Sequence, residues 1–172
     1  IFKNGIYKRQ VLSQQNYSSE TLPYKRGDIL DRDGNTLATS QKMYTLVLEP
    51  KNILRSEEVQ KATIDALHKY MKLDEDKLLK FIKRHKDSYY SVYREELSYS
   101  QIADLKDFIA SDKAENVSGI VFNEKYKRRY PNQSLASQVI GFVSDGTIGT
   151  GGIEQYYNST LSGVDGRKYK YL

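Results

Sequence analysis

The spacing of hydrophobic and polar residues changes along the chain, and the N-terminal part already shows two patterns. The turn sequence Asp-Gly-Asn at 33–35 lies between short apolar pairs and predicts a β-hairpin. Residues 42–49 then alternate with apolar side chains on both faces, which predicts a buried strand that Pro50 ends. Before the hairpin, residues 1–25 alternate only weakly, so we expect a loosely helical or extended connector.

The middle of the chain has the pattern of helices mixed with strands. Ser56 and Asp74 are predicted N-caps, and each precedes acidic residues and an apolar stripe at helical spacing. A strand is expected over 89–97, a third helix after the capping-box spacing at 98–101, and a further strand from Gly119. Because these helices cluster instead of alternating with strands, the pattern disfavours a doubly wound sheet and predicts an α+β fold.

Glycine becomes frequent in the last part of the sequence. We expect a short helix that Gly141 ends, a turn over 145–152 and a second helix from Ile153 that Gly163 ends. A final strand is expected over 168–172, where alternation returns.

These changes predict three parts. Residues 1–25 form the connector, residues 26–50 and 123–172 together form a discontinuous lobe, and residues 51–122 form an inserted α+β head lobe.

Composition and charge narrow the class of protein. The chain has 172 residues, of which 38% are hydrophobic on a count that includes 15 tyrosines, and this low apolar content predicts a thin, elongated fold. No apolar stretch is long enough to cross a bilayer. The net charge is +5, but residues 1–26 hold five cations and one anion, so a basic lead segment explains the charge better than a nucleic-acid-binding face.

The sequence lacks the usual catalytic motifs. No serine has a lysine three positions later, and the absence of cysteine excludes a thiol nucleophile and thiolate zinc sites. His68 and His85 have no second ligand at helical spacing, and the glycines at 146–152 lack the lysine of a phosphate-binding loop. We therefore expect no catalytic residue, no metal and no cofactor.

Two short motifs leave other functions open. The tripeptide Arg26-Gly27-Asp28 matches an integrin-type adhesion signal, so the alternative is a stand-alone extracellular binding or adhesion module. An enzyme that uses scattered carboxylates is a further rival. The run of cations and tyrosines over 125–130 is typical of a charged edge strand, and the alternatives are contact with an anionic surface or a groove for single-stranded nucleic acid.

Three patches carry a resemblance to a known family. Residues 26–38 fit the pattern Arg-Gly-x-Ile-x-Asp-Arg-x-Gly-x-x-Leu-Ala, and residues 128–131 fit Arg-x-Tyr-Pro. Residues 151–154, Gly-Gly-Ile-Glu, resemble a third motif, Gly-x-Gly-Ile-Glu, and residues 161–166 fit the Leu-x-Gly-x-x-Gly that follows it. In this order they resemble the N-terminal, non-catalytic dimerisation or pedestal domain of class B penicillin-binding proteins.

The resemblance implies a fold, a location and partners. The fold would be an elongated pedestal with an inserted α+β head lobe, and the parent protein would be a peptidoglycan D,D-transpeptidase whose catalytic domain lies beyond Leu172. An N-terminal transmembrane helix outside this chain would anchor the protein at the extracytoplasmic face of the bacterial membrane. The implied partners are its own transpeptidase domain, a membrane glycan polymerase, divisome or elongasome proteins and a second copy as a homodimer, with no nucleic acid.

The charges within these patches are candidates for a structural junction. Arg26, Asp31, Arg32 and Glu154 lie among glycines and apolar residues, and we hypothesise that they pair where the first and last segments meet. The candidate junction residues are Arg26, Gly27, Asp31, Arg32, Gly34, Arg129, Tyr130, Pro131, Gly152, Glu154 and Gly163.

Overall fold

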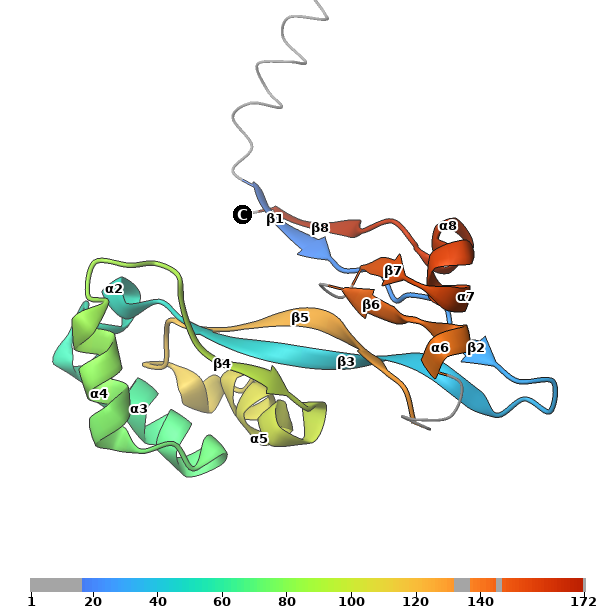
Figure 1. Ribbon diagram of the computed structural model, residues 1–172. Coiled ribbons are helices and arrows are strands. Elements are labelled where there is room, and N and C mark those ends of the chain that lie inside the picture. The colour runs from blue at the N-terminus through green and yellow to red at the C-terminus, as the bar shows by residue number, and fades with distance from the viewer. Residues whose placement is uncertain (1–16, 132–136, 145–146, 172) are drawn as a thin grey trace, which may run out of the picture. The chain divides into compact units, whose positions relative to one another are not determined.

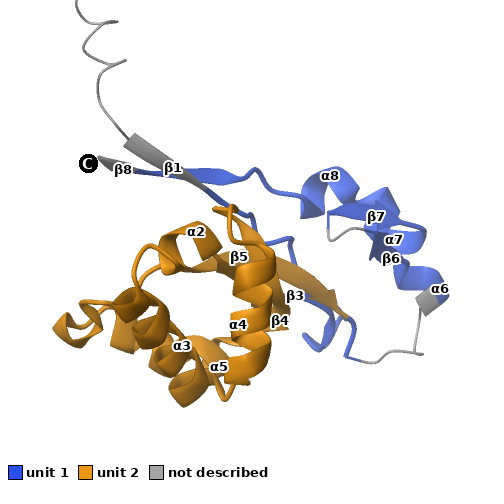
Figure 2. Ribbon diagram, turned by 90° about the vertical axis from the view of Figure 1, so that its left-hand side faces the viewer, with its two compact units in different colours: residues 1–40, 130–172 blue, residues 41–129 orange. Residues whose placement is uncertain are grey.

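The computed structural model describes residues 17–131, 137–144 and 147–171 (Figure 1). Most of the predicted connector lies outside the described residues, as do the start of the predicted helix that Gly141 ends, residues 145–146 of the predicted turn and the last residue of the strand expected over 168–172. The chain forms two compact units: unit 1 comprises 1–40 and 130–172, and unit 2 comprises 41–129 (Figure 2). The predicted α+β class is confirmed, whereas the lobe boundaries at 50/51 and 122/123 stay a prediction.

Unit 2 is built on an antiparallel sheet. Strand β3 (Thr36–Leu48) begins in unit 1 and continues into unit 2, where it lies between β4 (Ser91–Leu97) and β5 (Ile120–Arg129). The helices of this unit are α2 (Pro50–Ile53), α3 (Glu57–Met71), α4 (Glu75–Arg84), α5 (Tyr99–Ile109) and a 3₁₀ turn (Asp112–Ala114). Pro50 therefore ends β3, as expected, and also begins α2, where its missing N–H costs no hydrogen bond.

Local signals in the sequence account for the helix starts of unit 2. The Ser56 hydroxyl accepts a hydrogen bond from the Val59 amide at 3.2 Å, and the Asp74 carboxylate accepts one from the Lys77 amide at 2.8 Å. Both predicted caps are thus confirmed. The core of the unit packs one face of β3 against the helices, and its fully buried members include Leu46, Leu48, Ile53, Leu67, Leu78, Ile82, Ile102 and Leu105.

Unit 1 pairs the first described strand with the last. Strand β1 (Tyr17–Leu22) pairs antiparallel with β8 (Gly166–Tyr171), and β2 (Ile29–Leu30) pairs with the start of β3 as the predicted hairpin (Figure 1). A second hairpin joins β6 (Phe142–Ser144) to β7 (Ile148–Thr150). The helices are α6 (Ser137–Ile140), α7 (Gly152–Tyr156) and α8 (Asn158–Leu161).

The single helix that we predicted over 153–161 is wrong. The structure has two short helices, α7 and α8, because the backbone leaves helical geometry at Tyr157. The small core beside them contains Ile29, Ala38 and Ile140, with Ile153 and Leu161 packed against it. Among the described residues, none of the helices has the length and apolar character needed to cross a bilayer.

Candidate functional site

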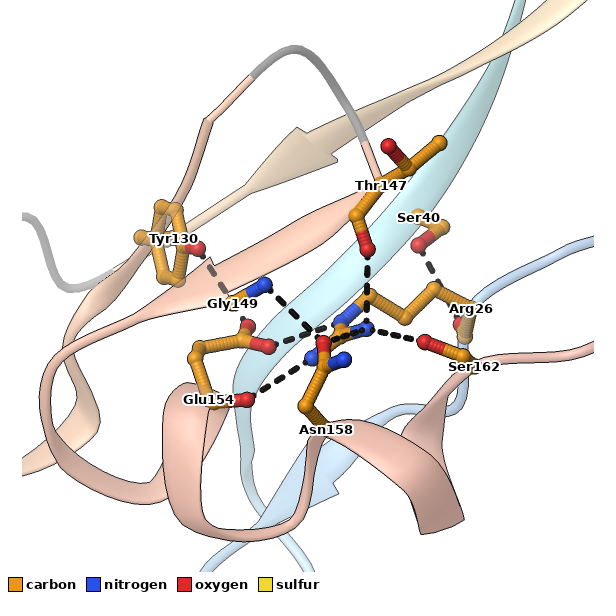
Figure 3. Close-up of polar contacts among 8 residues, drawn as sticks. All are labelled: Arg26, Ser40, Tyr130, Thr147, Gly149, Glu154, Asn158 and Ser162. Atoms are coloured by element: carbon orange, nitrogen blue, oxygen red, sulfur yellow. Dashed lines mark hydrogen bonds and ion pairs between the residues drawn. The ribbon is translucent and has the colours of Figure 1, made fainter.

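The most constrained polar feature of unit 1 is a buried arginine between β1 and β2. Arg26 is 1% exposed and Glu154, at the start of α7, is 0% exposed. The Arg26 Nε donates to Glu154 Oε2 at 2.8 Å, and Arg26 Nη2 donates to the Glu154 backbone carbonyl at 2.9 Å (Figure 3). Residues 128 positions apart are therefore joined by a charge-assisted pair shielded from water.

The rest of the guanidinium is surrounded by neutral acceptors. Arg26 Nη1 lies 3.0 Å from Asn158 Oδ1, 2.8 Å from Ser162 Oγ and 3.2 Å from the Thr147 carbonyl (Figure 3). The Arg26 carbonyl accepts a hydrogen bond from the Ser40 hydroxyl at 3.2 Å. A planar guanidinium has five donors in a fixed fork, so these partners fix its orientation as well as its position.

A tyrosine and a glycine complete the arrangement. The Tyr130 hydroxyl donates to Glu154 Oε1 at 3.2 Å, and the Gly149 amide donates to Asn158 Oδ1 at 2.9 Å. A Cβ at Gly149 would collide with the Glu154 carbonyl, so only glycine fits there. We call Arg26, Ser40, Tyr130, Thr147, Gly149, Glu154, Asn158 and Ser162 the Arg26 cluster.

The backbone beside the cluster also depends on glycine. Gly152, a predicted junction residue, has φ +49°, and a Cβ there would overlap the Val139 carbonyl. This close approach lets α7 begin against α6, which places Glu154 in the first turn of α7. Next to Arg26, the Gly27 amide donates to the Leu161 carbonyl at 2.8 Å, and this bond ties the chain after Arg26 to the end of α8.

Two of the four charges that we predicted to pair lie outside the cluster, so this part of the hypothesis is wrong. Asp31 accepts hydrogen bonds from the Asn35 side chain and amide, both at 2.8 Å, and these bonds hold the pKa of Asp31 below its usual value. The Arg32 side chain is 93% exposed and contacts only Asp33 among the ion pairs described, at 3.7 Å. Both residues belong to the turn of the β2–β3 hairpin, where the Asp31 carboxylate bonds the turn itself and the Arg32 side chain is exposed.

The other predicted junction residues have simpler roles. Gly34 has φ +85° in the hairpin turn, Gly163 packs against the Tyr24 ring, and Pro131 is exposed. Arg129 belongs to unit 2, where its Nε donates to Gln41 at 3.2 Å.

Sequence reasoning missed Asn158 and Ser162. Glu154, Asn158 and Ser162 recur at intervals of four, directly after the apolar positions 153, 157 and 161. That second stripe was the available signal, because on a helix residues four apart share a face.

The structure also tests the functions that the adhesion tripeptide and the cationic run left open. Burial of Arg26 keeps its guanidinium away from any receptor, which argues against an adhesion role for Arg26-Gly27-Asp28. In the cationic run, Lys125 pairs with Glu95 and Lys127 with Glu96, as on a charged edge strand.

The Arg26 cluster has no catalytic geometry. The Glu154 carboxylate is engaged by Arg26 and Tyr130 and exposes no surface, so a substrate cannot reach it. Within the described ranges, no group of three His, Asp or Glu side chains could hold a metal ion. The arrangement can fix the backbone of unit 1, and a buried pair of this kind fixes geometry more reliably than it adds stability.

Comparison with known proteins gives one family match. A family model described as the penicillin-binding protein dimerisation domain matches residues 21–171. Stage V sporulation protein D of Bacillus subtilis is 29% identical over 155 residues, which cover 86% of this chain and 22% of that protein. The probable peptidoglycan D,D-transpeptidase PenA of Neisseria meningitidis is 29% identical over 149 residues, which cover 86% of this chain and 24% of that protein.

Solved structures agree on the fold. Penicillin-binding protein 2X from Streptococcus thermophilus superposes with a TM-score of 0.68 at 26% identity, over 87% of this chain and 24% of that chain. Penicillin-binding protein PBP2 from Helicobacter pylori, solved in complex with MreC, gives a TM-score of 0.54 at 23% identity, over 91% of this chain and 31% of that chain. The chain thus spans about a quarter of the length of the curated relatives that it matches.

Proposed function

The chain belongs to the penicillin-binding protein dimerisation-domain family, and from this membership we propose that it is the non-catalytic pedestal of a bacterial peptidoglycan D,D-transpeptidase. In the parent protein it would hold the transpeptidase domain in a fixed position and carry no chemistry of its own. The parent would act on the cell wall from the extracytoplasmic face of the membrane. Its partners would be its own transpeptidase domain, a membrane glycan polymerase with other wall-synthesis proteins, and a second copy.

The observation that carries the pedestal role is the buried Arg26–Glu154 pair. A domain that positions another must keep its own backbone in a fixed conformation. This pair joins the segment that follows β1 to the segment that leads to β8. Because the guanidinium is bonded to both the side chain and the backbone of Glu154, neither segment can rotate without breaking buried hydrogen bonds.

Labelling with a fluorescent β-lactam tests whether the chain is non-catalytic. We expect no covalent label on the 172-residue chain and an adduct on the full-length parent. Labelling of the 172-residue chain itself would overturn the proposal.

A second experiment tests positioning. In the full-length parent, Arg26→Met should lower peptidoglycan cross-linking while the rate of β-lactam acylation stays close to wild type, because the catalytic groups are untouched. Arg32→Met is the matched control, since Arg32 is 93% exposed and should leave both measurements unchanged. If Arg26→Met folds, acylates and cross-links like the control, the pair has no positioning role.

A further inference from the structure

Unit 2 has a hollow between α3 and α5 that the pedestal role does not use. It has a volume of about 460 Å³, within the range of ligand pockets, and the two helices that flank it pack side by side (Figure 1). The hollow exists because α3 carries two small side chains, Ala62 and Ala66, one helical turn apart on the face toward α5.

The floor of the hollow is apolar. Tyr70 from α3 stacks on Phe108 from α5, with ring centroids 4.8 Å apart and planes inclined by 27°. Val117 and the two alanines complete the floor, and all of these residues are buried or half-buried. The stack, which we call the Tyr70–Phe108 wall, is rigid because both rings also pack against the core of unit 2.

The rim is charged and exposed, and its three carboxylates and two lysines, Lys69 and Lys113, give it a net charge of −1. Asp65, Asp112 and Glu115 are exposed, and within the described part of the chain none of the three forms an ion pair. Of the two lysines on the rim, Lys69 lies over the Tyr70 ring at 5.1 Å. The rim therefore carries one more negative than positive charge on a chain whose net charge is +5, and this local excess of negative charge favours a basic occupant.

We propose that this hollow docks a basic amphipathic segment of another protein, with one bulky apolar side chain seated on the Tyr70–Phe108 wall and Lys or Arg residues facing the rim carboxylates. An apolar, poorly hydrated centre inside a polar rim is the usual anatomy of a protein-binding hot spot. The inference goes beyond the pedestal proposal and does not depend on it, because it concerns unit 2 alone.

The distribution of polar groups argues against a saccharide as the occupant. A neutral sugar needs donors and acceptors that reach its hydroxyl groups from the floor of a site, as well as an aromatic face. Here every charged lining residue and Asn116 are exposed at the rim, and the floor offers a single polar group, the Tyr70 hydroxyl, beside apolar side chains and the two rings.

Binding of a model peptide to the whole 172-residue chain tests the proposal. The probe is a fluorescent amphipathic helix of about 18 residues made of Leu and Lys, long enough for several turns, and its counterpart replaces every Lys by Glu. By fluorescence anisotropy, we expect the Lys peptide to bind about tenfold more tightly than the Glu peptide. Chemical shifts of the Ala62, Ala66 and Asn116 amides should change on titration.

Two sets of variants locate the peptide. Ala62→Leu fills the hollow with a residue that favours helix, and it should weaken binding of the Lys peptide about tenfold. Asp112→Asn with Glu115→Gln should weaken binding several-fold and reduce its salt dependence. The matched controls are Ala110→Leu and Asp104→Asn, exposed positions outside the hollow, which should bind as wild type does.

Four outcomes would overturn the proposal. The first is unchanged binding by a folded Ala62→Leu variant, and the second is equal binding of the Lys and Glu peptides. The third is a shift of the hollow's amides on addition of a muropeptide-free glycan fragment but not of the Lys peptide, which would make the site a saccharide site. The fourth is self-association of the chain that Ala62→Leu abolishes, which would make a second copy the occupant.

Discussion

Replacing Arg26 by methionine is the sharpest perturbation of unit 1. Methionine keeps much of the length of the arginine stem but takes the cation away from the Glu154 carboxylate, which is 0% exposed. Breaking a buried ion pair by removing one partner costs about 3–5 kcal/mol, because the remaining charge stays in a medium that solvates it poorly. For a chain of this length, each kcal/mol shifts the unfolding midpoint by about 2–4 °C, so we expect Arg26→Met to lower it by about 6–20 °C.

A double-mutant cycle separates the pair from its surroundings. Glu154→Leu alone should cost about as much as Arg26→Met, because it buries the guanidinium beside neutral acceptors only. The double variant Arg26→Met/Glu154→Leu buries no charge at this position, so its loss should be well below the sum of the single losses. Additive losses would show that the two side chains act independently and would refute the reasoning.

The assay must distinguish the two units, because a chain with more than one compact unit need not unfold in a single step. Circular dichroism gives the midpoint, and hydrogen exchange gives the location of the loss. The Gly27 amide, bonded to the Leu161 carbonyl, should exchange faster in Arg26→Met, while the Leu78 amide in α4 should keep its protection. The control Arg32→Met, in an exposed side chain, should change stability by less than about 0.5 kcal/mol.

Further predictions concern the turns and close contacts of unit 1. Gly149→Ala should cost about 1–3 kcal/mol in a urea titration, because its Cβ would strike the Glu154 carbonyl, whereas Gly166→Ala, whose Cβ would lie 3.5 Å from Leu22 Cβ, should be nearly neutral. Equal losses would contradict the steric argument. Because the pKa of Asp31 is lowered in the folded state, its contribution is present above the unfolded pKa and is lost as the pH falls through the folded one. The stability difference between wild type and Asp31→Asn should therefore shrink below about pH 4. A constant difference from neutral to acid pH would exclude this linkage.

Much of the fold could be predicted because its signals are local. Ser56 and Asp74 act as caps through bonds to amides three positions away, so the sequence around them contains the whole interaction. The hairpin at 33–35 is equally local. The break between α7 and α8 at Tyr157 could not be predicted, because the apolar positions 153, 157 and 161 continue a helical stripe through it.

The candidate site shows the limit of sequence reasoning more sharply. Arg26 and Glu154 stood out because charge is rare among glycine and apolar residues, and the structure brings them together. Arg32 had the same local composition, yet the hairpin turns it to solvent. Which of two nearby arginines is buried depends on the tertiary path of the chain, and no local pattern contains that path.

The antiparallel pairing of β1 with β8 determines how unit 1 responds to mechanical load. Tyr17 is paired with Tyr171, so the outer ends of the two strands lie at the same end of the ladder, and Leu22 pairs with Gly166 at the other end. A force that pulls these outer ends apart opens the rungs one after another instead of shearing them all together. The two strands therefore separate pair by pair from this end, and the force acts on the buried guanidinium only after they have separated.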